Sequence, residues 1–316
     1  MRNGIKSTAL VAASTSYRCQ INAANNSEYF VPNSIPSGGS ASVGRIQAFF
    51  GNVAFDIYYP QDSSTSLPIL VLFQGGNVHS SFYSKYAARI ASSGYVVFVA
   101  NRCDLFIVEY FLYSPASLTN KVMSIAEVQN SLTGSLLYQK MNLDSVGLLG
   151  HSLGGVVGLF AMNNICEFPF CDAGYSFVSK VKAGIFYGSG LGANFDSNRF
   201  YKTSSGKGIP TGYIQGTLDG ANSPTSGLGS YNSAIATKAY FTVQGANHYS
   251  ITDVSNPFGA KVDPNIATLS QTDGIAKIAE TSIIFLDAYL KGSNTHLLKI
   301  TSDNLGISGV SATSAQ

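Results

Sequence analysis

The fold of this 316-residue chain is decided by the stretch Val146-Gly147-Leu148-Leu149-Gly150-His151-Ser152-Leu153-Gly154-Gly155. Its apolar start predicts a buried strand, and the residues after it, Val156–Met162, predict a helix. The turn between them has the pattern G-x-S-x-G, in which side chains at Gly150 and Gly154 would clash in a strained strand-to-helix turn. A glycine-rich turn kept only for packing is the alternative, and the flanking strand and helix disfavour it. We therefore expect Ser152 to project into a cleft as a nucleophile.

The rest of the chain alternates short apolar runs with helical segments. This alternation predicts an α/β fold with a mostly parallel central sheet and helices on both faces. The predicted strands are Ile69–Phe73, Val96–Ala100, Val146–Leu149, Ala183–Tyr187, Gly212–Gln215 and Ala239–Val243. The predicted helices are Ser81–Ser93, Leu118–Gln139, Gly154–Asn163 and Gly274–Lys291. Before them, Ile46–Phe50 and Val53–Pro60 flank the turn signal Gly51-Asn52 and predict an antiparallel N-terminal strand pair.

The composition along the chain predicts one domain with two tails. Residues 1–44 are a predicted N-terminal arm, which contains a weak signal segment at Ser7–Ser14 and becomes rich in Asn, Ser, Gly and Pro. Residues 45–299 are the predicted domain, and residues 300–316 a polar tail that frays after about Lys299. The signal segment and the charge-poor composition favour a secreted or extracytoplasmic location. No apolar run approaches the roughly 20 residues that span a bilayer.

Charge and cysteine content limit the classes of partner. Charged residues make up 11% of the chain, and 19 basic and 17 acidic side chains leave a net charge of +2 without long runs of one sign. Nucleic acid, stable membrane insertion and charged polymers are therefore not expected as partners, whereas a small neutral or hydrophobic substrate and a monomeric chain are expected.

The four cysteines lack the CxxC spacing of zinc sites, so no metal is expected. Cys166 and Cys171 close a short loop, as a disulfide or as two buried thiols.

A serine nucleophile needs a base, which in this type of site follows it along the chain after an acid. Of the four histidines only His248 and His296 follow Ser152. His248 lies just beyond the strand Ala239–Val243, at the carboxyl end where open α/β sheets place their sites. His296 lies past the last predicted helix and is predicted to be a surface residue. The predicted base is therefore His248.

The predicted acid is Asp219. It follows the strand Gly212–Gln215, next in order to the strand that delivers His248, so its carboxylate can hold the imidazole tautomer. An ordinary Asp219-Gly220 turn is the alternative. The other carboxylates between the serine and the histidine are not delivered by a strand; they are Glu167, Asp172 and Asp196.

A tetrahedral oxyanion needs two backbone donors. One is normally the amide after the nucleophile, here Leu153. The second is expected from the turn Gln74-Gly75-Gly76-Asn77 after the strand Ile69–Phe73, with Gly76 as the donor and Asn77 as the alternative. An ordinary turn without a catalytic role remains a third possibility.

From about Leu67 to Gly292 the sequence resembles the α/β-hydrolase superfamily, in the branch of chlorophyllases, dienelactone-hydrolase-like proteins and cutinase-like polyester hydrolases. Phe73-Gln74-Gly75-Gly76 is similar to the histidine-glycine oxyanion loop of those families, with Gln74 in place of the histidine. Tyr86–Val97 is similar to their helix and following strand. The resemblance implies the α/β-hydrolase fold and the same nucleophile, acid and base.

The expected function is therefore that of a serine esterase, which hydrolyses carboxylic esters through an acyl-enzyme and needs no metal or organic cofactor. A thioesterase or acyltransferase on the same residues is an alternative, because a fold does not fix the reaction. A non-catalytic binding protein of the same fold is another. The chain contains no tryptophan, so an aromatic clamp on the substrate would need Tyr or Phe.

Overall fold

The computed structural model describes most of the chain after residue 41. The described residues are 42–51, 53–63, 66–101, 103–106, 109–190, 208–235 and 237–315, with only the backbone described over 101–111. Most of the predicted N-terminal arm, with its signal segment, lies outside these ranges, as does the turn residue Asn52.

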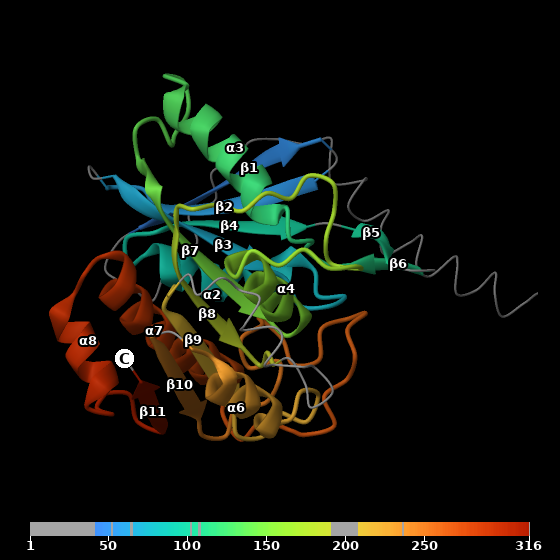
Figure 1. Ribbon diagram of the computed structural model, residues 1–316, viewed down its shortest axis with the longest axis vertical. Helices are drawn as coiled ribbons and strands as arrows, with labels where there is room; N and C mark the ends of the chain where they lie inside the picture. The colour runs from blue at the N-terminus through green and yellow to red at the C-terminus, as the bar shows by residue number, and fades with distance from the viewer. Residues whose placement is uncertain are drawn as a thin grey trace, which may run out of the picture.

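Within the described residues the main sheet has nine strands, in the order β1-β2-β4-β3-β7-β8-β9-β10-β11 (Figure 1). From β4 to β10 neighbouring strands run parallel, whereas β1, β2 and β11 run antiparallel to their neighbours. The predicted mostly parallel sheet with an antiparallel N-terminal pair is confirmed. The strands are β1 (Val43–Phe50), β2 (Val53–Pro60), β3 (Leu67–Phe73), β4 (Val96–Asn101), β7 (Met141–His151), β8 (Val181–Tyr187), β9 (Thr211–Gly216), β10 (Lys238–Val243) and β11 (Val310–Ala315).

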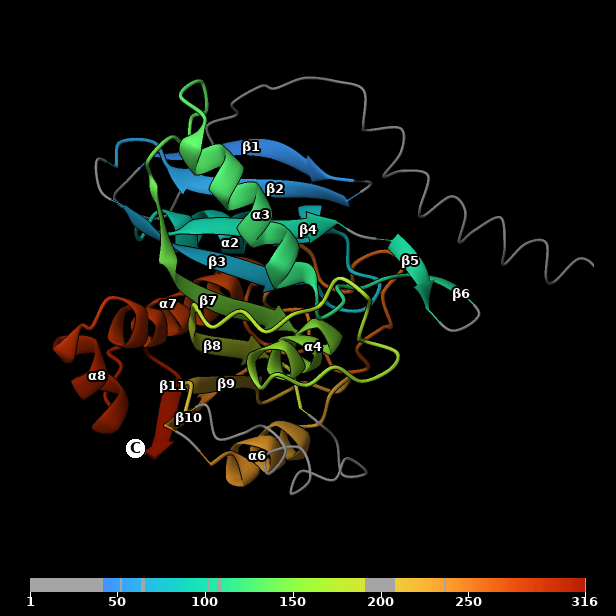
Figure 2. The same ribbon diagram turned by 45° about the horizontal axis from the view of Figure 1, so that its top comes forward.

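Helices cover both faces of the sheet, as the sequence predicted (Figure 2). α3 (Leu118–Ser131) and α4 (Leu153–Met162) pack on one face, and α2 (Ser84–Ala91) and α7 (Gln271–Leu290) on the other. All of β3 is buried, and its successive side chains enter the two hydrophobic clusters alternately. A strand buried on both faces needs a continuous apolar run, and this requirement explains the sequence pattern.

Two predicted helices differ from the structure by more than three residues at one end or are divided, whereas those at α4 and α7 agree to within three residues. The helix predicted over Leu118–Gln139 ends at Ser131, because the backbone of Leu132 is extended and Asn130 accepts a hydrogen bond from the Met141 amide through its side chain. The residues after Ser131, predicted as helix, form turns instead. The helix predicted over Ser81–Ser93 divides into a 3-10 turn, η2 (Ser80–Tyr83), and α2.

The predicted fraying after about Lys299 is wrong. The helix α8 (Asn294–Thr301) crosses that point, and β11 then pairs with β10 at the edge of the main sheet. The sequence Val310-Ser311-Ala312-Thr313-Ser314-Ala315 is too polar to indicate a strand, but an edge strand needs only a small buried surface, which Ala312 provides.

Other elements were not predicted. Helix α6 (Pro224–Ser233) begins where the Ser223 side chain accepts from the Thr225 amide, with proline in the first turn. A serine followed by proline is a typical helix start, so the sequence carries a signal for α6. The strands β5 (Cys103–Phe106) and β6 (Glu109–Leu112) form a separate antiparallel pair.

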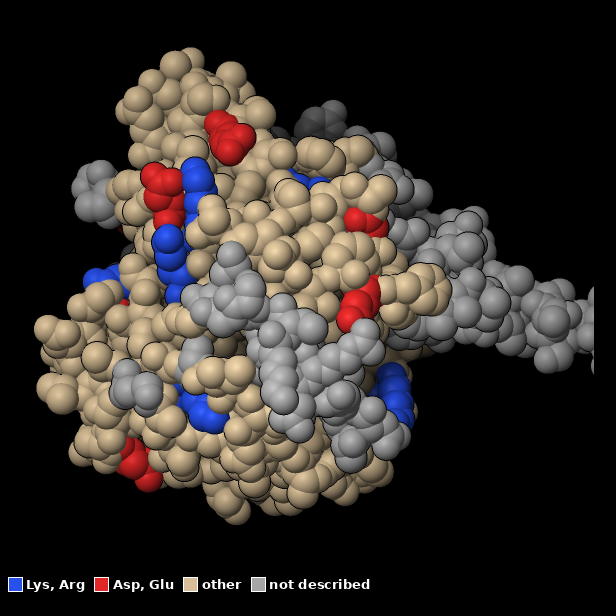
Figure 3. All heavy atoms as spheres, in the orientation of Figure 1, with Lys and Arg blue, Asp and Glu red and all other residues tan. Residues whose placement is uncertain are grey.

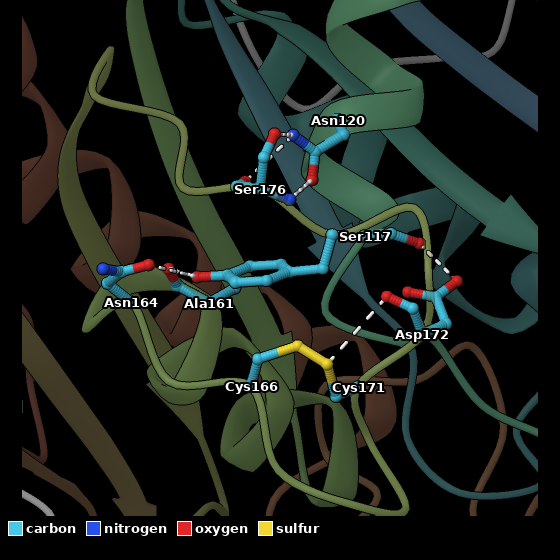
Figure 4. The surroundings of a disulfide bond; sticks show 9 residues. Ser117, Asn120, Ala161, Asn164, Cys166, Cys171, Asp172 and Ser176 are labelled. Carbon is cyan, nitrogen blue, oxygen red and sulfur yellow. Dashed lines mark hydrogen bonds between the residues drawn. A yellow bond between two sulfur atoms is a disulfide. The ribbon is translucent and has the colours of Figure 1, made fainter.

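A disulfide joins Cys166 to Cys171 beyond the end of α4, with the two Cα atoms 4.7 Å apart (Figure 4). Of the two states left open by the sequence, the structure has the bonded one. Asp172, the next residue, accepts a hydrogen bond of 2.6 Å from Ser117 at the start of α3, and Asn120 bonds Ser176. The disulfide loop is thus tied to α3 as well as to α4.

The face of the molecule drawn in Figure 3 is weakly charged. On the face seen in Figure 3, lysine, arginine, aspartate and glutamate are scattered among uncharged side chains. In the part of the chain that the structure describes, no helix is both long enough and apolar enough to cross a membrane.

Replacing both Cys166 and Cys171 with serine should lower the free energy of unfolding by about 2 kcal/mol, because the crosslink restricts a short loop of the unfolded chain. Urea denaturation of the oxidised protein and of the double variant measures the difference. Equal midpoints and slopes for the two proteins would show that the crosslink adds no stability.

Candidate active site

Ser152 occupies the turn between β7 and α4, with φ 54° and ψ −125°. L residues rarely adopt this backbone conformation, and it persists only when the surroundings hold it. The Ser152 amide donates to the carbonyl of Tyr187 at 3.0 Å, and the Ser189 hydroxyl donates to the Ser152 carbonyl at 3.0 Å. Both contacts come from the end of β8 and the residues after it, so the neighbouring strand holds the serine in place.

The glycines around Ser152 are required by close backbone contacts. A Cβ on Gly150 would lie 2.6 Å from the Cα of Gly155, and one on Gly154 would lie 2.3 Å from the carbonyl oxygens of Phe73 and Gln74. The predicted clash at both glycines is therefore confirmed. The contact of Gly154 also brings the end of β3 directly against the start of α4.

The structure brings Ser152, His248 and Asp219 together in one hydrogen-bonded series. His248 Nε2 lies 2.8 Å from Ser152 Oγ, and His248 Nδ1 lies 2.8 Å from Asp219 Oδ2. Because a carboxylate only accepts, Nδ1 carries the proton and Nε2 is left to accept from the serine hydroxyl. Asp219 and His248 follow the parallel neighbours β9 and β10, as the sequence predicted, and both are buried.

The Asp219 carboxylate is held by more than the histidine. Its Oδ1 accepts from the amides of Ala221 at 3.1 Å and Asn222 at 2.8 Å, and its Oδ2 accepts from Gln215 Nε2 at 3.0 Å. These donors fix the carboxylate toward the imidazole and stabilise its charge inside the protein.

A second buried carboxylate, Asp263, was missed by the sequence analysis. Its Oδ2 accepts from the His248 amide at 2.7 Å, and its Oδ1 accepts from the amides of Gly220 at 3.1 Å and Asn265 at 2.8 Å. Asp263 thereby joins the loop of the histidine to the loop of Asp219. The bond to Asn265 is an Asx turn, and the sequence Asp263-Pro264-Asn265 signals only such a turn.

The two amides predicted as oxyanion donors lie on the two segments that meet at Gly154. Neither the Leu153 amide nor the Gly76 amide has a hydrogen-bond acceptor among the described residues. The amide of Asn77, the alternative donor, instead donates to the Leu112 carbonyl at 2.9 Å, which favours Gly76.

The remaining candidate acids and bases lie elsewhere. His296 is in α8, where its Nδ1 lies 2.9 Å from Ser293 Oγ and 3.6 Å from an Asp287 oxygen. Asp172 is bonded to Ser117 next to the disulfide. Asp196 lies outside the described residues.

His151, beside the nucleophile, is fully buried, and its ring centroid lies 4.8 Å from that of His248. Burial lowers the pKa of His151 well below its ordinary value, and the neighbouring His248 lowers it further. His151 is therefore neutral at physiological pH and adds no positive charge beside His248.

No group of three or more His, Cys, Asp or Glu side chains among the described residues could hold a metal ion. Comparisons with models of known protein families and with curated proteins find no match for this chain.

Replacing Gly154 with alanine should lower the free energy of unfolding by at least about 3 kcal/mol, because the added Cβ meets rigid backbone at 2.3 Å. The matched control is Gly229→Ala in α6, where an added Cβ meets nothing within 4 Å and stability should rise by up to about 1 kcal/mol. Chemical denaturation of both variants gives the comparison. Equal stability of the two variants would mean that the turn is not as tightly packed as described.

Proposed function

We propose that this chain is a serine hydrolase of carboxylic esters with the α/β-hydrolase fold, in which Ser152 is the nucleophile, His248 the general base and Asp219 the acid. The observation that carries the proposal is the buried series Asp219–His248–Ser152, with both contacts at 2.8 Å, ending on a serine held in a strained turn. Packing alone requires none of these hydrogen bonds, whereas serine activation requires both.

Acylation begins when Ser152 Oγ attacks the ester carbonyl carbon and its proton passes to His248 Nε2. The carbonyl π electrons move to oxygen, which becomes the oxyanion of a tetrahedral intermediate. The bond to the alkoxy oxygen then breaks, and that oxygen takes the proton from His248 as the alcohol leaves. Asp219 stabilises the imidazolium that exists between these two proton transfers.

The amides of Leu153 and Gly76 are the proposed oxyanion donors. Leu153 is the first residue of α4, so its amide and the helix dipole both favour negative charge at that point. Gly76 lies two residues beyond Gln74, whose carbonyl lies against Gly154, so the two proposed donors come from segments that meet at the start of α4.

Deacylation repeats the same proton transfers with water. His248 takes a proton from the attacking water, whose oxygen bonds the acyl carbon, and a second oxyanion forms. Its collapse breaks the bond to Ser152 Oγ, which recovers a proton from His248, and the carboxylic acid leaves. No step needs a redox change or an added group.

The surroundings of His248 favour a neutral, apolar substrate. Val262 and Ile266 flank Asp263 and are 64% and 87% exposed. The carbonyl of the intervening Asn265 accepts from Asn247 Nδ2 at 2.9 Å, which places this segment against the loop of His248. Exposed aliphatic side chains at this position can pack against the apolar part of an ester.

Ser152→Ala should reduce hydrolysis of p-nitrophenyl acetate by about 10⁴-fold or more in kcat, because it removes the hydroxyl that His248 Nε2 contacts and with it the proposed acyl-enzyme. The control is Ser282→Ala, which removes another buried serine hydroxyl, bonded to Tyr86 far from the turn. Steady-state kinetics measures both. Wild-type turnover by Ser152→Ala would remove Ser152 from the mechanism.

Ile266→Ser should lower kcat/KM about fivefold for p-nitrophenyl octanoate while changing the value for the acetate less than twofold, since only the long chain reaches the lost aliphatic surface. Ile235→Ser is the matched control, because Ile235 is 70% exposed but precedes β10, at the opposite end from His248. An unchanged ratio between the two esters would show that the apolar chain binds elsewhere.

A further inference from the structure

The fully buried side chain of His151 connects the loop of the base to another part of the site. Its Nε2 lies 2.9 Å from the carbonyl oxygen of His248, and its Nδ1 lies 2.9 Å from the hydroxyl of Tyr83. Because a carbonyl only accepts, His151 Nε2 carries the proton and Nδ1 is left with a lone pair. The Tyr83 hydroxyl therefore donates to His151 Nδ1.

The same hydroxyl reaches the turn that carries the proposed oxyanion donor. Tyr83 OH accepts from the Gly75 amide at 2.8 Å, one residue before Gly76. A Cβ on Gly75 would lie 2.7 Å from His151 Nδ1, so the turn packs directly on the imidazole. The hydrogen bonds run in one direction, from the Gly75 amide through Tyr83 and His151 to the His248 carbonyl.

The charge states of the two side chains keep this direction fixed. Burial holds the pKa of His151 well below, and that of Tyr83 well above, their ordinary values, so the ring stays neutral and the hydroxyl keeps its proton. A charged His151 would lose the acceptor that Tyr83 uses. It would also lie beside His248 at the moment when His248 gains a proton.

We propose that His151 and Tyr83 are positioning residues that couple the oxyanion turn at Gly75-Gly76 to the loop of the general base, so that both are held in register with Ser152. The inference rests on the proposed function. Both side chains are fully buried, and each acts through a backbone group, the Gly75 amide at one end and the His248 carbonyl at the other.

Such a link matters because oxyanion donors and bases act only within narrow geometric limits. The bond to Tyr83 fixes the peptide plane between Gln74 and Gly75. The Gly75 carbonyl accepts from the Val78 amide at 3.0 Å, which holds the next plane, the one that carries the Gly76 amide. The bond from His151 fixes the carbonyl of His248, while Asp263 fixes its amide. Loss of the link should therefore reduce the stabilisation of the transition state more than it reduces the affinity for the ester.

Amide side chains can break the link at either end. In His151→Gln the terminal nitrogen takes the place of Nε2, so the donor to the His248 carbonyl is kept and the acceptor for Tyr83 is lost. In His151→Asn the side-chain oxygen takes the place of Nδ1, so the acceptor for Tyr83 is kept and the donor to the His248 carbonyl is lost. Tyr83→Phe removes the hydroxyl from both of its partners.

The experiment measures kcat and KM for a p-nitrophenyl ester, and the concentration of active enzyme is determined by titration with a serine-reactive phosphonate. It also measures the inhibition constant of a trifluoromethyl ketone, which forms a tetrahedral adduct with the serine. We expect each variant to lose about tenfold in kcat with KM changed less than twofold, and about the same factor in ketone affinity. His151→Gln combined with Tyr83→Phe should lose much less than the product of the single losses, because both changes break the same bond.

Tyr86→Phe is the matched control, because Tyr86 is also buried in this part of the chain and its hydroxyl bonds Ser282 at 2.9 Å, away from the site. It should lower the melting temperature as Tyr83→Phe does and leave kcat per titrated site unchanged. If Tyr83→Phe and the His151 variants also keep wild-type kcat and ketone affinity per titrated site, the coupling is wrong. If the wild-type protein neither hydrolyses esters nor reacts with the phosphonate, the proposed function itself fails.

Discussion

The strained turn at Ser152 is the constraint on which the rest of the site depends. A φ of 54° on a serine costs free energy, and the structure offsets it with hydrogen bonds to the end of β8 and with glycines that let α4 begin against β3. The same close approach brings the first amide of α4 next to the turn after β3. The conformation that exposes the hydroxyl thus also assembles the surface where an oxyanion can be held.

The histidine side of the site depends on two buried carboxylates with different tasks. Asp219 bonds the imidazole, whereas Asp263 bonds the backbone amide of His248 and the amide of Gly220. Tyr187, on β8, donates from its hydroxyl to the Asn247 carbonyl, so a third strand also holds the loop. A histidine held on its ring, its amide and its carbonyl has little freedom to leave Ser152, and this rigidity favours the proposed proton transfer.

The sequence predicted what local patterns can encode. Buried parallel strands are continuous apolar runs, and the order serine, acid, histidine along β7, β9 and β10 predicted three side chains that the structure brings into one hydrogen-bonded series. Asp263 could not be found in this way, because its role depends on contacts between loops and its local sequence signals only a turn. Strand β11 was missed because an edge strand of small polar residues has no apolar alternation, and the end of α3 because a side chain of Asn130 closes it. The role of His151 needed the positions of both neighbours of its ring.

The most direct test of the central claim is to label the protein with a fluorophosphonate and to identify the labelled residue by mass spectrometry of its peptides. The account predicts one phosphonyl group per chain on Ser152, formed rapidly by the wild-type protein and very slowly by His248→Ala, since the histidine removes the serine proton. A folded wild-type protein that remains unlabelled, or that carries the label on another residue, would contradict it.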